Sequence, residues 1–287
     1  MDLDYTDYTY ACLEDLELKA SFYRSEKAET DRTILYFHGG GLVYGKRQDL
    51  PDEYIFNLLE AGYHFLAFDY PLAPESSLRV ITQAVKDGIY WFVENARSTL
   101  QLNQSDYVLF GRSAGAYLCY LMAADETLPK PKRLIAFYGY SSLAHQAFTE
   151  PSAHYMQFPQ LPETVISRLI KPYPIAEAPL QTRFALYLHA RQSGKWLDLL
   201  TDSSEDITTY ELTEEQLNQL PPTFIAHSRT DKDVPYGIAE KLSHQIPEVY
   251  LHSIPNGDHD FDRDTESADG PRTYQQLINW LKDEQHV

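Results

Sequence analysis

Residues 107–116, YVLFGRSAGA, place a serine between two glycines directly after a short apolar run. The five residues from Gly111 to Gly115 fit the pattern G-x-S-x-G. Between a strand and a helix, this pattern holds a serine on a tight turn with its hydroxyl exposed at the edge of a sheet. The pattern is short enough to arise by chance, so the rest of the chain must distinguish a nucleophile from a structural turn serine at Ser113.

The composition is that of a folded domain with an acidic surface. The chain has 287 residues, 43% of them hydrophobic, and a formal net charge of −18. This hydrophobic content supports a packed core. Phosphate contacts need lysine and arginine, so the charge argues against nucleic acid and anionic membrane surfaces as partners. No run of about 18 apolar residues occurs, so we expect no membrane span.

The N-terminal residues and the cysteines bear on the compartment. The first 18 residues contain neither a basic nor a long apolar region, so we expect no secretory signal and a cytoplasmic protein. Two cysteines make a disulfide framework unexpected. Cys119 stands in an apolar run and is expected to be reduced and buried. The oligomeric state stays open, with a homodimer as one alternative.

Short apolar segments alternate with helical patterns along much of the chain. The apolar segments are nearly continuous, which is typical of strands buried on both faces of a parallel sheet. These candidate strands cover residues 33–37, 63–69, 107–110, 133–138, 223–227 and 249–254. Candidate helices cover residues 52–61, 78–96, 113–124, 236–245 and 274–282. This order predicts an α/β protein with a mostly parallel central sheet flanked by helices.

The stretch over residues 140–220 breaks this alternation. It contains short helical patterns and proline clusters but no clear strand. We therefore predict a single domain over residues 1–287, with a helical cap or lid inserted at 140–220 before the candidate strand at 223–227. The alternative is a second helical domain unrelated to any site.

A serine nucleophile needs a base, and the base needs an acid that orients it. His259 lies in NGDHDF, just after the last candidate strand, and Asp231 lies in SRTDKDVP, just after the strand at 223–227. Loops at the carboxyl ends of parallel strands collect catalytic groups. The chain order Ser113, Asp231, His259 is the one expected on such a sheet.

Other aspartates lie close to these two residues. Asp233 competes with Asp231 for the role of the acid, although Asp231 stands three residues before Val234, as a D-x-x-V-P segment requires. Three more aspartates flank His259 and are expected to be solvated, namely Asp258, Asp260 and Asp262. A metal site here would need a third ligand that we cannot identify, so we expect none.

The stretch FHGGGLVYG, residues 37–45, follows the first candidate strand. Successive glycines let backbone N–H groups approach a ligand closely and point at it. We expect the N–H groups of Gly40, Gly41 and Ala114 to form an oxyanion hole. His38 is expected to anchor this loop through a backbone hydrogen bond.

Five motifs occur in a characteristic order along the chain. They are HGGG at 38–41, DYPLAPE at 69–75, GRSAG at 111–115, D-x-x-V-P at 231–235 and G-x-H-x-F at 257–261. Together they resemble the α/β-hydrolase fold, and within it the esterases similar to hormone-sensitive lipase and bacterial acetyl esterases. The resemblance covers roughly residues 33–140 and 221–285. It implies hydrolysis of small carboxylic esters without a cofactor, and a variable cap between the two matching parts.

The chain departs from that family pattern in three places. Arg112 stands where an aspartate is often found, Ala116 replaces a further glycine, and the segment before the first clear strand is too short for a large N-terminal cap. We expect Arg112 and Tyr44 to contact the substrate. Two alternatives stay open: an amidase, aryl formamidase or peptidase of the same fold, and a non-catalytic protein that binds ligands in the same pocket.

Overall fold

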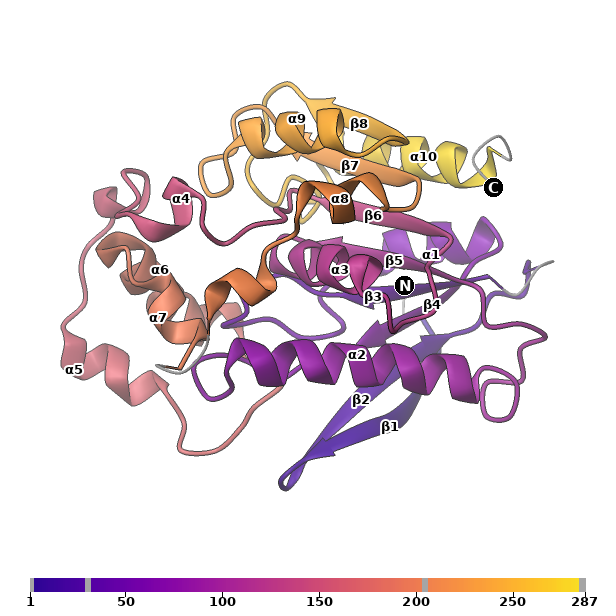
Figure 1. Ribbon diagram of the computed structural model, residues 1–287, viewed down its shortest axis with the longest axis horizontal. Helices are drawn as coiled ribbons and strands as arrows, with labels where there is room; N and C mark the ends of the chain where they lie inside the picture. Colours follow the sequence, from indigo (N-terminus) through magenta and orange to yellow (C-terminus); the bar gives the residue numbers. More distant parts are fainter. Residues whose placement is uncertain (1–2, 29–31, 203–205, 284–287) are drawn as a thin grey trace.

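The computed structural model describes residues 3–28, 32–202 and 206–283. Its centre is one sheet with the strand order β1-β2-β4-β3-β5-β6-β7-β8 (Figure 1). The strands are β1 (Thr6–Leu13), β2 (Leu16–Tyr23), β3 (Thr33–Phe37), β4 (His64–Phe68), β5 (Tyr107–Arg112), β6 (Arg133–Phe137), β7 (Thr223–Ser228) and β8 (Val249–Ile254). From β4 to β8 all neighbours are parallel. The six predicted strands are all present, and the predicted fold class is confirmed.

The sequence did not predict the first two strands. β1 and β2 form an antiparallel hairpin, and β2 pairs antiparallel with β4. β1 is an edge strand with most of its residues at least partly exposed. Such a strand carries no continuous apolar run, so it lacks the signal that identified the buried strands.

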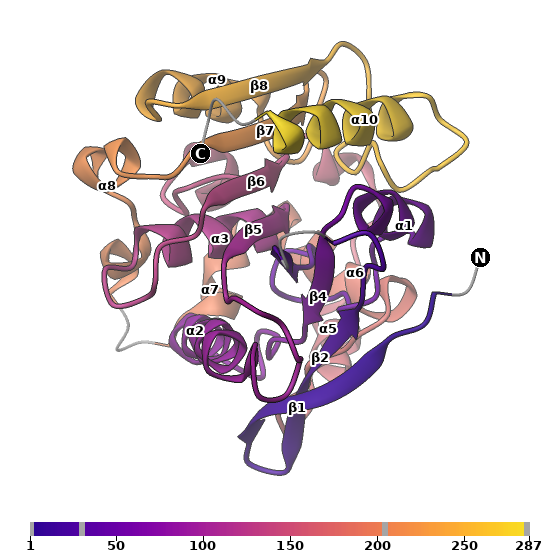
Figure 2. The ribbon, with the colours of Figure 1, turned by 90° about the vertical axis from the view of Figure 1, so that its right-hand side faces the viewer.

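Helices cover both faces of the sheet. They are α1 (Asp52–Glu60), α2 (Leu78–Asn95), α3 (Ala114–Ala124), α9 (Tyr236–Gln245) and α10 (Asp269–Lys282). Figure 2 shows α1 and α10 on one face and α2, α3 and α9 on the other. Two apolar clusters fill the space between helices and sheet, one on each face. Cys119 is free and fully buried in one of them, as predicted.

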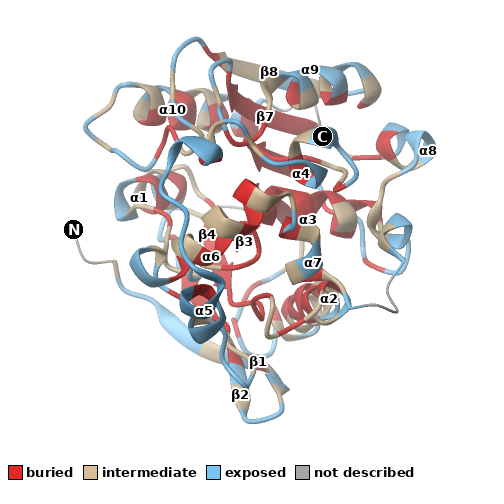
Figure 3. Ribbon diagram, turned by 90° about the vertical axis from the view of Figure 1, so that its left-hand side faces the viewer, coloured by how far each residue is buried: buried red, intermediate tan, exposed pale blue. Residues whose placement is uncertain are grey.

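Residues 140–220, which the sequence predicts to be an insertion and which we call the inserted segment, lie between β6 and β7 and contain several helices. These are α4 (Gln146–Thr149), α5 (Glu163–Ile166), α6 (Leu180–Ser193), α7 (Trp196–Leu200) and α8 (Glu214–Asn218). In its described residues there is no strand, only an isolated bridge between Ala178 and Gly45. Helices α4 to α7 gather at one end of the sheet (Figure 1), and Figure 3 shows that α5 is largely exposed and α3 is largely buried.

Contacts identify which end of the sheet the inserted segment covers. The indole Nε1 of Trp196 donates to the carbonyl oxygen of Gly41 at 3.0 Å, just beyond β3. The guanidinium of Arg183 pairs with Glu75, in the loop after β4, at 2.7 Å. The segment therefore packs on the carboxyl ends of the strands. Among the described residues, every helix is too short or too polar to cross a bilayer.

Candidate active site

Ser113 is the single residue between the end of β5 at Arg112 and the start of α3 at Ala114, and it forms the turn between them. Its backbone has φ 52° and ψ −119°, a conformation that a residue with a side chain rarely adopts. The flanking glycines are required by space: a Cβ on Gly111 would lie 2.2 Å from the carbonyl oxygen of Gly115, and one on Gly115 would lie 2.0 Å from that of Phe37. The G-x-S-x-G pattern thus produces the tight turn that the sequence predicted.

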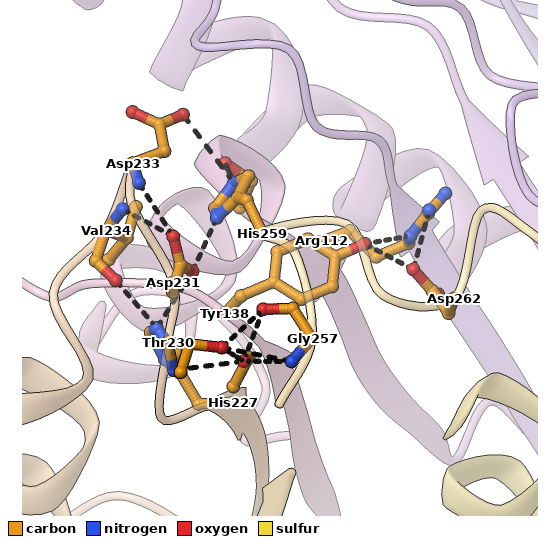
Figure 4. A network of polar contacts seen from close by, with 12 residues as sticks. Arg112, Tyr138, His227, Thr230, Asp231, Asp233, Val234, Gly257, His259 and Asp262 are labelled. Atoms are coloured by element: carbon orange, nitrogen blue, oxygen red, sulfur yellow. Dashed lines mark hydrogen bonds and ion pairs between the residues drawn. The ribbon is translucent and has the colours of Figure 1, made fainter. Parts of the chain in front are cut away.

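The structure brings Ser113, His259 and Asp231 into one chain of hydrogen bonds. Ser113 Oγ lies 2.9 Å from His259 Nε2, and His259 Nδ1 lies 2.7 Å from Asp231 Oδ2. The other oxygen of Asp231 accepts from the backbone N–H groups of Asp233 and Val234, at 2.8 and 3.0 Å (Figure 4). Both oxygens of this carboxylate are therefore fixed, and the imidazole is directed at the serine.

His227 is a residue of this site that sequence reasoning missed. It lies in β7 with no exposed surface, and its Nε2 is 3.1 Å from Asp231 Oδ2 and 2.9 Å from the carbonyl oxygen of Val234. It thus shares an oxygen of the acid with His259. Nothing in the sequence marks it, because a histidine inside an apolar strand usually packs without a polar role.

The charges around the imidazole shift two pKa values in opposite directions. Burial by itself would lower the pKa of His259, but the carboxylate of Asp231 outweighs burial, and Asp233 and Asp260 add to its effect, so the pKa rises to about 9. Burial would likewise raise the pKa of Asp231, yet the charge of His259 and the hydrogen bond from His227 hold it well below its usual value. The fold therefore favours an imidazolium–carboxylate pair.

The glycine loop lies against the serine. Gly40 and Gly41 have φ values of 105° and 59°, and both line the same cavity as Ser113. Ala114 is the first residue of α3, where helix N–H groups are free of intrahelical partners. Gly40 and Gly41 therefore lie beside Ser113, and an oxyanion hole formed by the N–H groups of Gly40, Gly41 and Ala114 stays a prediction.

His38 stabilises the glycine loop through contacts with its backbone. It is fully buried, its Nδ1 lies 2.7 Å from the carbonyl oxygen of Gly39, and its ring stacks on Tyr70. The hydroxyl of Tyr70 donates to the carbonyl oxygen of His38 at 2.9 Å. These contacts confirm the expectation that His38 anchors the backbone.

Arg112 points into a buried polar cluster that includes Tyr138 and Asp262 (Figure 4). Its Nε donates to the hydroxyl of Tyr138 at 2.6 Å, its Nη2 donates to Asp262 Oδ1 at 2.9 Å, and its Nη1 lies 3.5 Å from Asp49 Oδ2. The expectation that Asp262 is solvated is wrong: its side chain is fully buried, and it also accepts from the hydroxyl of Tyr274. The cation of Arg112 compensates the buried carboxylate, which ties the turn before Ser113 to the loop after His259.

A cavity of about 350 Å³ opens in front of Ser113 and His259. Tyr44 and Arg112, the two predicted substrate contacts, both contribute to its wall. Charged residues are frequent around it, including Lys46, Asp49, Glu177, Asp233, Asp260 and Arg263. Within the described residues no group of three or more histidine, cysteine or acidic side chains is arranged to hold a metal ion.

Comparison with known proteins identifies the class of this chain. A family model described as alpha/beta hydrolase fold matches residues 34–263, so the chain belongs to that family. A Staphylococcus aureus protein of unknown function is 31% identical, with 96% of this chain and 98% of that one covered and a TM-score of 0.86. An alpha/beta hydrolase superfamily protein from Enterococcus faecalis is 27% identical, with 98% and 99% covered and a TM-score of 0.79.

More distant similarities extend to an esterase and to a small part of a much longer synthase. An esterase from Pyrobaculum calidifontis is 20% identical, with 99% of this chain and 86% of that chain covered and a TM-score of 0.70, which shows a shared fold. The non-reducing polyketide synthase adrD of Penicillium rubens is 25% identical over 280 residues, covering 79% of this chain. The chain spans only 11% of that synthase, about a tenth of its length.

Proposed function

We propose that this chain is a serine hydrolase that cleaves small carboxylic esters through an acyl-enzyme. The observation that carries the proposal is the hydrogen-bonded series from Ser113 through His259 to Asp231, with distances of 2.9 and 2.7 Å. It stands on a strained turn that faces a cavity. Structures of the same fold include an esterase from Pyrobaculum calidifontis and a bacterial heroin esterase.

In the first half of the reaction, His259 Nε2 takes the proton of Ser113 as Oγ attacks the ester carbonyl carbon. Asp231 stabilises the imidazolium that forms. The N–H groups of Gly40, Gly41 and Ala114 donate to the carbonyl oxygen as it becomes an oxyanion. His259 then gives the proton to the leaving alcohol as the ester C–O bond breaks.

In the second half, water replaces the alcohol. His259 removes a proton from the water as its oxygen attacks the acyl carbon, and then returns that proton to Ser113 Oγ as the acid leaves. No cofactor takes part in either half. In this proposal residues 1–287 form one domain, and the inserted segment is a cap that closes the cavity, with Tyr44 and Arg112 on its wall.

Replacement of the nucleophile tests the proposal directly. Ser113→Ala is expected to lower kcat on a short-chain aryl ester by a factor on the order of 10⁶, because no acyl-enzyme can form without the Ser113 hydroxyl. The wild type is expected to form a covalent adduct with a fluorophosphonate, and the variant is not. Retention of most turnover by a folded Ser113→Ala protein, or failure of the wild type to react, would overturn the assignment.

A substrate series refines the acyl and leaving groups. Aryl esters from acetate to dodecanoate are expected to show falling kcat/KM with chain length, because the cavity is small and bordered by charged side chains. Matched aryl amides compared with the esters separate an esterase from an amidase. A maximum at long chains would contradict the small-ester assignment.

A further inference from the structure

A second carboxylate lies close to the proposed base. Asp233 Oδ2 is 3.9 Å from His259 Nε2, the same nitrogen that lies 2.9 Å from Ser113 Oγ. The Asp233 side chain is 10% exposed and lines the cavity. A free carboxylate here could move to hydrogen-bond distance and bind the protonated Nε2 in competition with the serine. The imidazole would then be held away from its nucleophile.

Two side chains of α6 restrain this carboxylate. The hydroxyl of Tyr187 lies 2.9 and 3.0 Å from the two carboxylate oxygens of Asp233. One turn further along the helix, Arg191 donates through Nη1 to Asp233 Oδ1 and through Nη2 to the Asp233 carbonyl oxygen at 3.1 Å. The inserted segment thus binds both carboxylate oxygens of Asp233, including the Oδ2 atom that lies near His259.

Arg191 is itself fixed in place. It is 2% exposed, and its Nη2 also donates to the carbonyl oxygen of Ala147 at 3.0 Å. Its guanidinium carbon lies 5.4 to 5.7 Å from four aromatic ring centres, those of Phe148, Tyr155, Tyr187 and Trp196. A buried ion pair often contributes no more stability than apolar side chains of the same volume. Stability alone therefore does not account for a cation at this place.

Other charged groups approach the imidazole from different sides. Asp231 faces Nδ1 and is shared with His227. Asp260 forms an ion pair with Arg263, and the ring of Tyr138, which Arg112 contacts, lies 4.7 Å from the imidazole ring. Asp233 instead lies next to Nε2, the nitrogen that faces Ser113.

We propose that Arg191 is a positioning residue: by pairing with Asp233 it keeps that carboxylate off His259 Nε2, so that the imidazole stays on Ser113. The inference rests on the proposed function, because it assigns a task to the base of that reaction. It gives the inserted segment a direct influence on the chemistry, since Arg191 belongs to α6.

Three variants test this role: Arg191→Met, Asp233→Asn and the double variant. Arg191→Met frees the carboxylate, so kcat is expected to fall about a hundredfold and the acidic limb of the kcat/KM profile to move to higher pH. Asp233→Asn removes the negative charge, and the limb is expected to move about one pH unit lower. The double variant is expected to recover most of the lost kcat and to share the pH profile of Asp233→Asn.

A second buried arginine of α6 provides the matched control. Arg183 is 3% exposed and pairs with Glu75, whose side chain is fully buried and lies outside the cavity wall. Arg183→Met, alone and with Glu75→Gln, is expected to change the melting temperature and leave the acidic limb in place. A shift equal to that of Arg191→Met would mean that loss of any buried cation has this effect, and would overturn the proposal.

The outcomes separate this proposal from the proposed function. A double variant as slow as Arg191→Met, with circular dichroism showing both folded, would contradict a role acting through Asp233. Where Arg191→Met does not fold, Asp233→Asn alone decides: an acidic limb at the wild-type pH overturns the inference. Failure of the serine mechanism would instead appear as turnover by Ser113→Ala.

Discussion

At the scale of single residues, the groups around His259 determine the pH range in which its imidazole is neutral and can act as a base. Asp231 binds Nδ1 at 2.7 Å, while Asp233 and Asp260 add negative charge nearby. Together they outweigh burial and raise the pKa of His259 to about 9. The free protein therefore holds its proposed base mainly in the protonated form at neutral pH.

The pH dependence of kcat/KM follows from this pKa. Only neutral imidazole accepts the serine proton, so kcat/KM on a neutral ester is expected to rise with pH and level off above about 9. The profile is measured from mildly acidic to alkaline pH, with Ser113→Ala as the blank for spontaneous hydrolysis. A plateau already reached below neutral pH would contradict the prediction.

The raised pKa of His259 affects stability and activity in opposite directions as the pH rises. Protonated His259 is favoured by the fold, so its contribution is fully present below its usual pKa of 6.5 and is lost as pH rises through about 9. Deprotonation of His259 therefore has two effects over the same pH range. It supplies the neutral imidazole that the reaction needs, and it removes the stabilising ion pair between His259 and Asp231.

At the scale of elements, the contact between α3 and β3 sets the geometry of the site. α3 carries Ala114, and β3 leads into the glycine loop, so their separation determines where the proposed N–H donors meet. Gly115 determines that separation, since a Cβ there would lie 2.0 Å from the carbonyl oxygen of Phe37 and 2.5 Å from that of His38. Both neighbours are backbone atoms and cannot rotate away.

Gly115→Ala is therefore expected to lower the free energy of unfolding by about 3 kcal/mol, since overpacking forces the helix off the strand. Gly237→Ala is the control, because Gly237 lies in α9 with nothing within 4 Å of an added Cβ. It is expected to change stability by no more than about 1 kcal/mol. Urea unfolding measures both, and equal midpoints for Gly115→Ala and the wild type would contradict the packing argument.

At the scale of the whole molecule, the excess of negative charge lies at the surface. Three buried arginines pair with carboxylates that are themselves buried: Arg112 with Asp262, Arg183 with Glu75 and Arg191 with Asp233. These pairs join parts of the chain that are distant in sequence. The net charge of −18 consequently acts as repulsion among solvent-exposed groups.

Salt is therefore expected to stabilise the protein. Raising sodium chloride to about 0.5 M brings the screening length well below its value of about 10 Å at 0.1 M, so surface repulsion weakens while the buried pairs are screened less. The melting temperature should rise, and potassium chloride should give the same rise if no specific ion is bound. A melting temperature that falls with salt would show that exposed ion pairs outweigh the repulsion.

The sequence by itself determined the parallel part of the sheet and the turn at Ser113. Strands buried on both faces need continuous apolar runs, and the tight turn needs glycines at two fixed positions. Because each requirement concerns residues that are adjacent in the chain, both can be recognised in the sequence. The hairpin of β1 and β2 was not predicted, because β1 is an exposed edge strand and because charged and polar residues interrupt the apolar residues of β2. The order of the five motifs predicted which distant residues would meet.

Only the tertiary structure decided which polar groups pair inside the molecule. The sequence predicted that Asp262 is solvated, but in the structure it is buried and accepts a hydrogen bond from Arg112. Nothing near His227 in the sequence indicated that its side chain contacts Asp231. Nor did the pairing of Arg191 with Asp233 leave a local pattern. Ion pairs between segments depend on how helices and loops pack, and a charged side chain looks the same in sequence whether it faces water or a buried partner.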